Sequence, residues 1–123
     1  MHDPQTEKTV LIVEDDEDIG LFLVQCIVHE TPYRALLVTN GSDALQAMRT
    51  IRPSLFLLDY RLPGMNGIEL YDHLQRLEAG GEIPAIMMSA TLPHREIAQR
   101  RLVGMHKPFD VYDLLRTIET LIA

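Results

Sequence analysis

The chain of 123 residues contains a single cysteine, Cys26, and no tryptophan, and its 11 lysine and arginine residues are outnumbered by 18 acidic ones. One cysteine excludes an internal disulfide and favours a reducing compartment. The net charge of −7 argues against nucleic acid binding by this domain, because phosphate contacts need clustered basic side chains, and it is compatible with a bound cation. No stretch approaches the roughly 18 apolar residues of a membrane span.

The domain organisation follows from length and local composition. Residues 1–8 are polar and lack the apolar core of a signal peptide, so we expect a flexible N-terminus and a cytoplasmic protein. Hydrophobic residues make up 46% of the chain, which is enough to build one core. Because no repeat, low-complexity segment or linker divides the rest, residues 9–123 are predicted to form a single domain.

Five short apolar runs predict five strands, and each is followed by a stretch with helical signals. The predicted strands are residues 9–13, 34–38, 54–58, 84–88 and 103–106, and the predicted helices include residues 43–51, 67–78 and 93–102. Asn66 and Glu69 have the spacing of a capping box, while Ser42 and Asp110 are predicted caps for the second and last helices. Short strands alternating with helices predict an α/β domain, a parallel sheet with helices on both faces.

The first helix has apolar residues at i, i+3, i+4, i+7 and i+8, which predicts one buried face. These residues are Ile19, Phe22, Leu23, Cys26 and Ile27. Because free cysteine is usually buried, Cys26 is interpreted as a structural thiol on this face.

Polar residues end four of the five strands. Glu14 and Asp15 follow the first strand, Asp59 the third, Ser89 the fourth and Lys107 the fifth. The carboxyl ends of parallel strands share one edge of a sheet, so these side chains should converge. Carboxylates about 4 Å apart repel by roughly 4 kcal/mol at an effective dielectric near 20, so they need a counter-charge. A hard cation that prefers oxygen ligands, such as Mg²⁺ (or Mn²⁺), supplies it. A metal and a lysine around a carboxylate nucleophile suit phosphoryl transfer.

The chain resembles the receiver domain of bacterial two-component response regulators, in particular that of the chemotaxis response regulators. The resemblance is carried by the segments VLIVEDDEDI, LLDYRLPGMNGIEL, IMMSA and HKPFD. It implies a flavodoxin-like (βα)5 fold with a five-stranded parallel sheet of order 2-1-3-4-5. It also implies a phosphoprotein of phosphorelay signalling. A partner histidine kinase or histidine phosphotransfer protein would donate the phosphoryl group, in a Mg²⁺-dependent reaction, to a 4-aspartylphosphate.

The resemblance also assigns roles to residues by position. It makes Asp59 the phosphoacceptor, Lys107 the phosphate-contacting lysine and Ser89 the switch hydroxyl. The implied metal ligands are Asp59, Asp15, Glu14 acting through water, and the backbone carbonyl of Arg61. The implied supporting residues are Asp16, Ala90 and Pro108, with a cis peptide bond between Lys107 and Pro108.

The resemblance further implies a domain that catalyses only its own phosphorylation and dephosphorylation and turns over no external substrate, hence no enzyme in the ordinary sense. It implies a monomer or weak dimer, an unidentified downstream partner, and no direct contact with nucleic acid or membrane. The chain would be either a stand-alone regulator or part of a longer regulator or hybrid kinase.

Two departures from the family pattern concern the output face. The family usually carries an aromatic residue three positions before the lysine, where this chain has Gly104. Ser89 and Lys107 are 18 residues apart, a shorter interval than usual, so the fourth helix should be short, distorted or mobile. His106 lies on the same strand face as Gly104, and we hypothesise that it takes part of the aromatic role. Unchanged phosphorylation-dependent NMR shifts after His106→Ala would contradict this.

Other interpretations stay open at this point. A Mg²⁺-dependent phosphatase or phosphotransferase with an aspartate nucleophile would use a D-x-D pattern after its first strand, whereas Glu14, Asp15 and Asp16 are contiguous. A degenerate receiver could act as a constitutive interaction module. The basic residues Arg95, Arg100 and Arg101 form either a solvated helix face or a docking surface for an acidic partner. The five histidines show no metal-ligand spacing.

Overall fold

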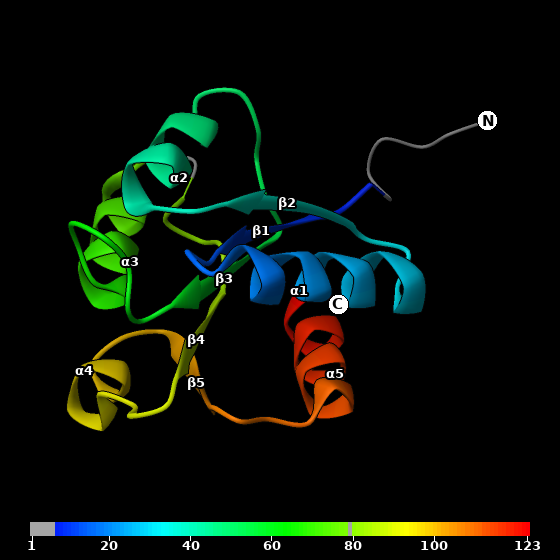
Figure 1. Ribbon diagram of the computed structural model, residues 1–123. Coiled ribbons are helices and arrows are strands. Elements are labelled where there is room, and N and C mark those ends of the chain that lie inside the picture. Colours follow the sequence, from blue (N-terminus) through cyan, green and yellow to red (C-terminus); the bar gives the residue numbers. More distant parts are fainter. Residues whose placement is uncertain (1–6, 79) are drawn as a thin grey trace.

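The computed structural model describes residues 7–78 and 80–123. All strand pairs are parallel, in the order β2-β1-β3-β4-β5, which confirms the predicted flavodoxin-like topology (Figure 1). The strands are β1 (Thr9–Val13), β2 (Arg34–Val38), β3 (Leu55–Asp59), β4 (Ala85–Ser89) and β5 (Leu102–His106).

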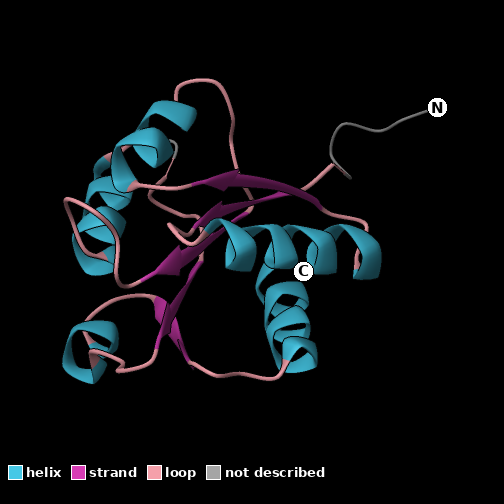
Figure 2. Ribbon diagram, viewed as in Figure 1, coloured by secondary structure: helices cyan, strands magenta, loops and turns pink. Residues whose placement is uncertain are grey.

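Five helices complete the predicted strand–helix alternation. They are α1 (Glu17–Glu30), α2 (Gly41–Ala47), α3 (Gly67–Arg76), α4 (His94–Ala98) and α5 (Val111–Ile122). Helices α1 and α5 cover one face of the sheet, and α2 and α3 cover the other, with α4 beside β5 (Figure 2). The three layers enclose two apolar clusters, because successive residues of a strand point to opposite faces. Thus Leu11 and Val13 pack toward α2 and α3, while Val10 and Ile12 pack toward α1 and α5.

The caps of α2 and α3 show how local sequence sets helix starts. The predicted cap Ser42 is wrong: the side-chain oxygen of Asn40 accepts from the Asp43 N–H at 2.7 Å, so α2 begins at Gly41. The helix also ends at Ala47, earlier than expected, because the next residues turn through i→i+3 bonds such as Thr50 N–H to the Ala47 carbonyl. The capping box of α3 is confirmed, with reciprocal bonds of 2.9 and 3.1 Å between Asn66 and Glu69.

The buried face of α1 differs from the prediction. Leu23 and Ile27 are buried as expected, but Ile19 is 40% and Phe22 53% exposed, and Cys26 is only partly buried. The reason is Gly20, where an added Cβ would lie 2.7 Å from the Leu37 methyl carbons of β2. This close approach turns the Gly20 side of α1 to the sheet and rotates the predicted apolar edge outward.

Helix α4 is short, as expected from the Ser89–Lys107 interval, and it is shorter than the predicted residues 93–102. None of its residues is buried, and Pro93 offers no side-chain cap. Arg100, just beyond the helix, donates to both carboxylate oxygens of Asp72 at 2.8 and 2.9 Å, and to the Glu96 carbonyl at 2.9 Å. Arg100 therefore anchors α4 to α3, so it is part of neither a solvated helix face nor a docking surface for an acidic partner. Arg95 and Arg101 are exposed.

We expect Arg100→Gln to speed amide hydrogen exchange at the end of α4, at Ile97 and Gln99. The bidentate pair is charge-assisted and lowers the pKa of Asp72, so its loss should lower the free energy of unfolding by about 1 kcal/mol. NMR exchange rates and urea unfolding measure the two effects. Arg95→Gln, which removes an exposed arginine of the same helix, is the control. Equal exchange rates in both variants would contradict the anchoring role.

The predicted flexible segment, residues 1–8, lies mostly outside the described residues, and so does His2. Of its two described residues, Glu7 pairs with Arg34 at 2.6 Å, and the Lys8 ammonium donates to the Ile122 carbonyl at 3.3 Å. Among the helices of residues 7–78 and 80–123, none has the length and apolar character that a bilayer crossing needs.

Candidate functional site

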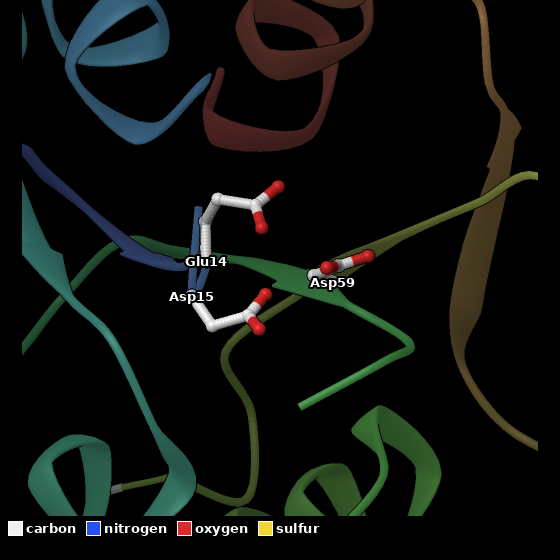
Figure 3. Close-up of side chains that lie close together, drawn as sticks. All are labelled: Glu14, Asp15 and Asp59. Carbon is white, nitrogen blue, oxygen red and sulfur yellow. The ribbon is translucent and has the colours of Figure 1, made fainter. Parts of the chain in front are cut away.

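Acidic and basic side chains from three strand ends meet at one edge of the sheet. The Lys107 ammonium, which follows β5, lies 3.2 Å from Asp59 Oδ1 and 3.3 Å from Glu14 Oε1. Asp15 joins them, and Figure 3 shows the three carboxylates pointing toward a common space. The predicted convergence of Glu14, Asp15, Asp59 and Lys107 is therefore confirmed as geometry.

The chain after β1 holds the acids in different environments. The Glu14 N–H donates to the Val38 carbonyl at 3.1 Å, which extends the pairing with β2 by one residue and directs Glu14 inward, where it is 1% exposed. Asp15 is exposed. The Asp16 carboxylate accepts from the N–H groups of Asp18 and Ile19 at 3.0 and 3.1 Å and caps α1. Asp16 thus supports the turn that presents the other two acids.

Asp59 is the last residue of β3 and is 6% exposed. The turn behind it is tight: the Gly67 N–H donates to the Tyr60 carbonyl at 2.8 Å, and a Cβ at Gly67 would lie 2.6 Å from the Asp59 carbonyl oxygen. Glycine is therefore required at position 67, where α3 begins. The sequence places Gly67 directly after the Asn66 cap, but it does not reveal this close approach to Asp59. Arg61 is exposed in this turn, and the ligand role of its carbonyl stays a prediction.

The carboxylates of the cluster outnumber the single ammonium beside them. Burial, reinforced by the Asp59 carboxylate, raises the pKa of Glu14 from 4.5 to about 7, against the opposing Asp16 N–H and Lys107 ammonium. Burial alone would lower the pKa of Lys107, but Asp59 and Glu14 outweigh it and raise that pKa. Glu14 and Asp59 thus share one ammonium and Asp15 adds a third carboxylate, so the site has an excess of negative charge.

The donor set fits a hard divalent cation. Glu14, Asp15 and Asp59 each offer a carboxylate oxygen, and these oxygens lie within 4.8 Å of one another. Mg²⁺ and Mn²⁺ prefer such oxygen ligands, and two of the three acids are already held in place by burial. In the described part of the chain, this is the one group of three His, Cys, Asp or Glu side chains so arranged.

Ser89 reaches the same edge, but its hydroxyl is engaged elsewhere. It is 4% exposed, donates to the Thr91 carbonyl at 2.8 Å and accepts from the Thr91 N–H at 3.1 Å. The Lys107 N–H donates to the Ser89 carbonyl at 2.8 Å, so the ends of β4 and β5 are joined. The predicted cis bond between Lys107 and Pro108 is confirmed. Ala90 is exposed beside this turn. The two hydrogen bonds between Ser89 and Thr91 were not predicted. Serine at a turn is nevertheless known to bond to the backbone two residues further along the chain.

A family model described as the response regulator receiver domain matches residues 10–119 of this chain. The chain belongs to the receiver domain family of response regulators. The transcriptional regulatory protein PcoR of Escherichia coli is 33% identical to this receiver domain over 117 residues. That match covers 92% of the chain but 50% of PcoR, so the chain spans half the length of this relative.

Solved structures agree with the receiver fold. The chemotaxis response regulator CheY4 of Vibrio cholerae superposes with a TM-score of 0.85 at 23% identity, over 94% of this chain and 99% of that one. The receiver domain of a sensor histidine kinase from Pseudomonas aeruginosa superposes with a TM-score of 0.78 at 25% identity, over 95% of this chain and 98% of that one. That structure was solved with a magnesium ion coordinated in its active-site cleft.

We expect the metal-free receiver to lose stability as the pH rises toward neutrality, through Glu14. A carboxyl whose pKa is 4.5 unfolded and about 7 folded binds more protons in the folded state between these values. Its contribution is therefore complete below pH 4.5 and is lost as the pH rises through 7, a change of about 3 kcal/mol at most. Urea unfolding in chelator from pH 5 to pH 8 measures it.

The comparison variant is Glu14→Gln, which keeps the side-chain shape and removes the titration. Its unfolding free energy should change less over the same pH range than that of the unmodified chain. Glu17→Gln, at an exposed acid in the first turn of α1, serves as the matched control and should retain the full slope. Parallel pH profiles for the Glu14 variant and the unmodified chain would show that the titrating group is elsewhere.

Proposed function

We propose that Asp59 accepts a phosphoryl group from the phosphohistidine of a partner histidine kinase or phosphotransfer protein, and that the domain changes conformation in response. The observation that carries the proposal is the position of Asp59. It is a nearly buried carboxylate at a strand end, 3.2 Å from the Lys107 ammonium and grouped with two further acids. Membership of the receiver family supports the same assignment.

The chemistry can be followed by atom. A carboxylate oxygen of Asp59 attacks the phosphorus atom, a P–O bond forms, and the P–N bond to the donor imidazole breaks. The electron pair of that bond returns to the imidazole nitrogen, which takes up a proton. Lys107, already directed at Asp59, binds the negative phosphoryl oxygens and orients them. In dephosphorylation, water attacks the same phosphorus atom, and inorganic phosphate and the Asp59 carboxylate are released.

Glu14, Asp15, Asp59 and the carbonyl of Arg61 would hold Mg²⁺ or Mn²⁺, with Glu14 acting through water. When bound, such an ion neutralises charge on the transferred phosphoryl oxygens. The clustered carboxylates support this, and so does the magnesium seen in the cleft of the Pseudomonas aeruginosa receiver domain.

The proposal extends to the setting of the domain. It catalyses its own phosphorylation and dephosphorylation and turns over no external metabolite, in contrast to an aspartate-dependent phosphatase. We propose a bacterial, cytoplasmic signalling domain, a monomer or weak dimer, that contacts neither nucleic acid nor membrane itself. The acidic composition supports this last point. Any DNA-dependent output would reside outside this chain or in the unidentified downstream partner.

The test is incubation of the purified chain with acetyl phosphate, with Mg²⁺ or with chelator. We expect a base-labile acyl phosphate on the peptide that contains Asp59, formed only with the metal. Hydrolysis of p-nitrophenyl phosphate should stay at the buffer rate. Modification of another residue, or equal modification in chelator, would overturn the proposal, and a complete lack of modification would favour a constitutive interaction module.

A further inference from the structure

A groove of about 600 Å³ lies between α2 and α3, the two helices that pack side by side on one face of the sheet (Figure 1). We call it the α2–α3 groove. Its apolar lining consists of Leu45, Met48 and Leu77, which pack against the core beneath these helices. Pockets for small molecules usually measure about 300 to 1,000 Å³ and combine an apolar lining with a few polar groups. The α2–α3 groove has the size and the lining of such a pocket.

The α2–α3 groove is positively charged, although the chain has a net charge of −7. Arg49, which follows the C-cap of α2, and Arg76, the last residue of α3, both line it. Glu78 is the one acid among its lining residues. The C-terminal end of a helix carries a partial negative charge, which favours cations and keeps both guanidinium groups near the groove. Two arginines against one acid make the groove a place where an anion is attracted.

In the part of the chain that the structure describes, neither Arg49 nor Arg76 has a carboxylate oxygen within ion-pair distance. Asp72 is close enough to be affected: its pKa is lowered chiefly by Arg100 and to a smaller extent by Arg76. Both of its carboxylate oxygens, however, accept from Arg100, at 2.8 and 2.9 Å. A guanidinium group binds carboxylates and phosphates through two parallel hydrogen bonds. The donors of Arg49 and Arg76 are therefore available to an anion from solution.

We propose that the α2–α3 groove binds a small organic anion, an apolar body that carries a phosphate or carboxylate group. The apolar body lies against Leu45, Met48 and Leu77, and the anionic group pairs with Arg49 and Arg76. A neutral ligand would leave the arginines unused, and an inorganic anion would leave the apolar lining in water, so the lining selects a molecule with both parts. The inference goes beyond phosphorylation and does not rest on it, because the groove shares no lining residue with the acidic cluster.

Fluorescence titration with 8-anilinonaphthalene-1-sulfonate tests the proposal. This probe has an apolar ring system and one sulfonate, which stands in for a phosphate or carboxylate. We expect saturable binding of one probe molecule per chain, weakened by added salt and opposed only slightly by inorganic phosphate. N-phenyl-1-naphthylamine, the same ring system without the sulfonate, should bind about tenfold more weakly, because it cannot pair with the arginines.

Charge variants of the lining should change the affinity in opposite directions. Arg49→Gln and Arg76→Gln should each raise the dissociation constant of the sulfonate probe about threefold, the range expected for one exposed ion pair. Glu78→Gln removes the one acid of the lining and should lower the dissociation constant about twofold. Arg95→Gln is the matched control, because Arg95 is an exposed arginine of α4 outside the groove, and it should leave the affinity unchanged.

Backbone amide NMR locates the bound probe, and its shifts should concentrate at residues 45–49 and 76–78. Shifts concentrated instead at the smaller groove between α1 and α5, which Phe22 and Tyr112 line, would overturn the proposal. So would equal affinity for the sulfonate probe and its neutral counterpart, a lack of saturable binding, or Arg49 and Arg76 variants that bind as well as Arg95→Gln. These results leave the function proposed for Asp59 untouched, because the acetyl phosphate reaction measures that function separately.

Discussion

Replacing Asp59 by asparagine is expected to abolish phosphorylation by acetyl phosphate while leaving the protein folded. The amide is a far weaker nucleophile than the carboxylate, and Lys107 cannot supply a substitute oxygen. We therefore expect the rate of acyl phosphate formation to fall by roughly three orders of magnitude or more. Mass spectrometry of the acetyl phosphate reaction, followed by mapping of the labelled peptide, measures the loss.

The stability of the same variant should change little, which separates chemistry from folding. Asp59 and Glu14 share the single ammonium of Lys107, at 3.2 and 3.3 Å. Removing the Asp59 charge costs one ion pair but relieves the repulsion between the two carboxylates. We expect the free energy of unfolding in chelator to change by about 1 kcal/mol or less in either direction.

The control is Asp113→Asn on α5, which removes an exposed carboxylate away from the strand ends. Its phosphorylation should equal that of the unmodified chain. Persistent labelling of the Asp59→Asn variant at another residue would show that the phosphoacceptor is not Asp59. Loss of labelling in the Asp113 variant would show that the assay reports something other than the site.

The placement of the site could be predicted because it depends on topology alone. Apolar runs located every strand within one or two residues, and parallel strands bring their carboxyl ends to one edge. Glu14, Asp15, Asp59 and Lys107 were therefore placed at one edge once the alternation was recognised, and their proximity along that edge depends on the strand order. The strand order came from the family resemblance, because periodicity identifies strands without saying which ones pair.

The features that could not be predicted depend on contacts between distant residues. Nothing local to α1 reveals that Gly20 approaches Leu37, which is why the exposed positions of Ile19 and Phe22 were missed. Nor does the sequence around Gly104 reveal that Leu92 and Ile97 fill its missing side chain. Periodicity reports which residues are apolar, whereas these contacts depend on how closely a distant side chain approaches the backbone of a glycine.

Replacing Lys107 by methionine is expected to destabilise the metal-free receiver by about 2 to 3 kcal/mol at pH 8, and to do so much less at pH 5. Methionine preserves the apolar stem but leaves the buried Glu14 and Asp59 carboxylates without a counter-charge. At pH 5 Glu14 is protonated, since its pKa is already about 7 with Lys107 present, and one of the two charges is gone. Urea unfolding in chelator at the two pH values measures the difference.

Lys8→Met is the matched control, because Lys8 is the only other lysine of the chain and its ammonium donates to the Ile122 carbonyl, away from the acidic cluster. Its small cost should be the same at pH 5 and pH 8. Addition of Mg²⁺ at pH 8 should raise the unfolding free energy of the Lys107 variant more than that of the Lys8 variant, since a divalent cation restores the missing positive charge. If Lys107→Met were equally destabilised at both pH values, its loss would reflect packing, and the shared counter-charge at Glu14 and Asp59 would be contradicted.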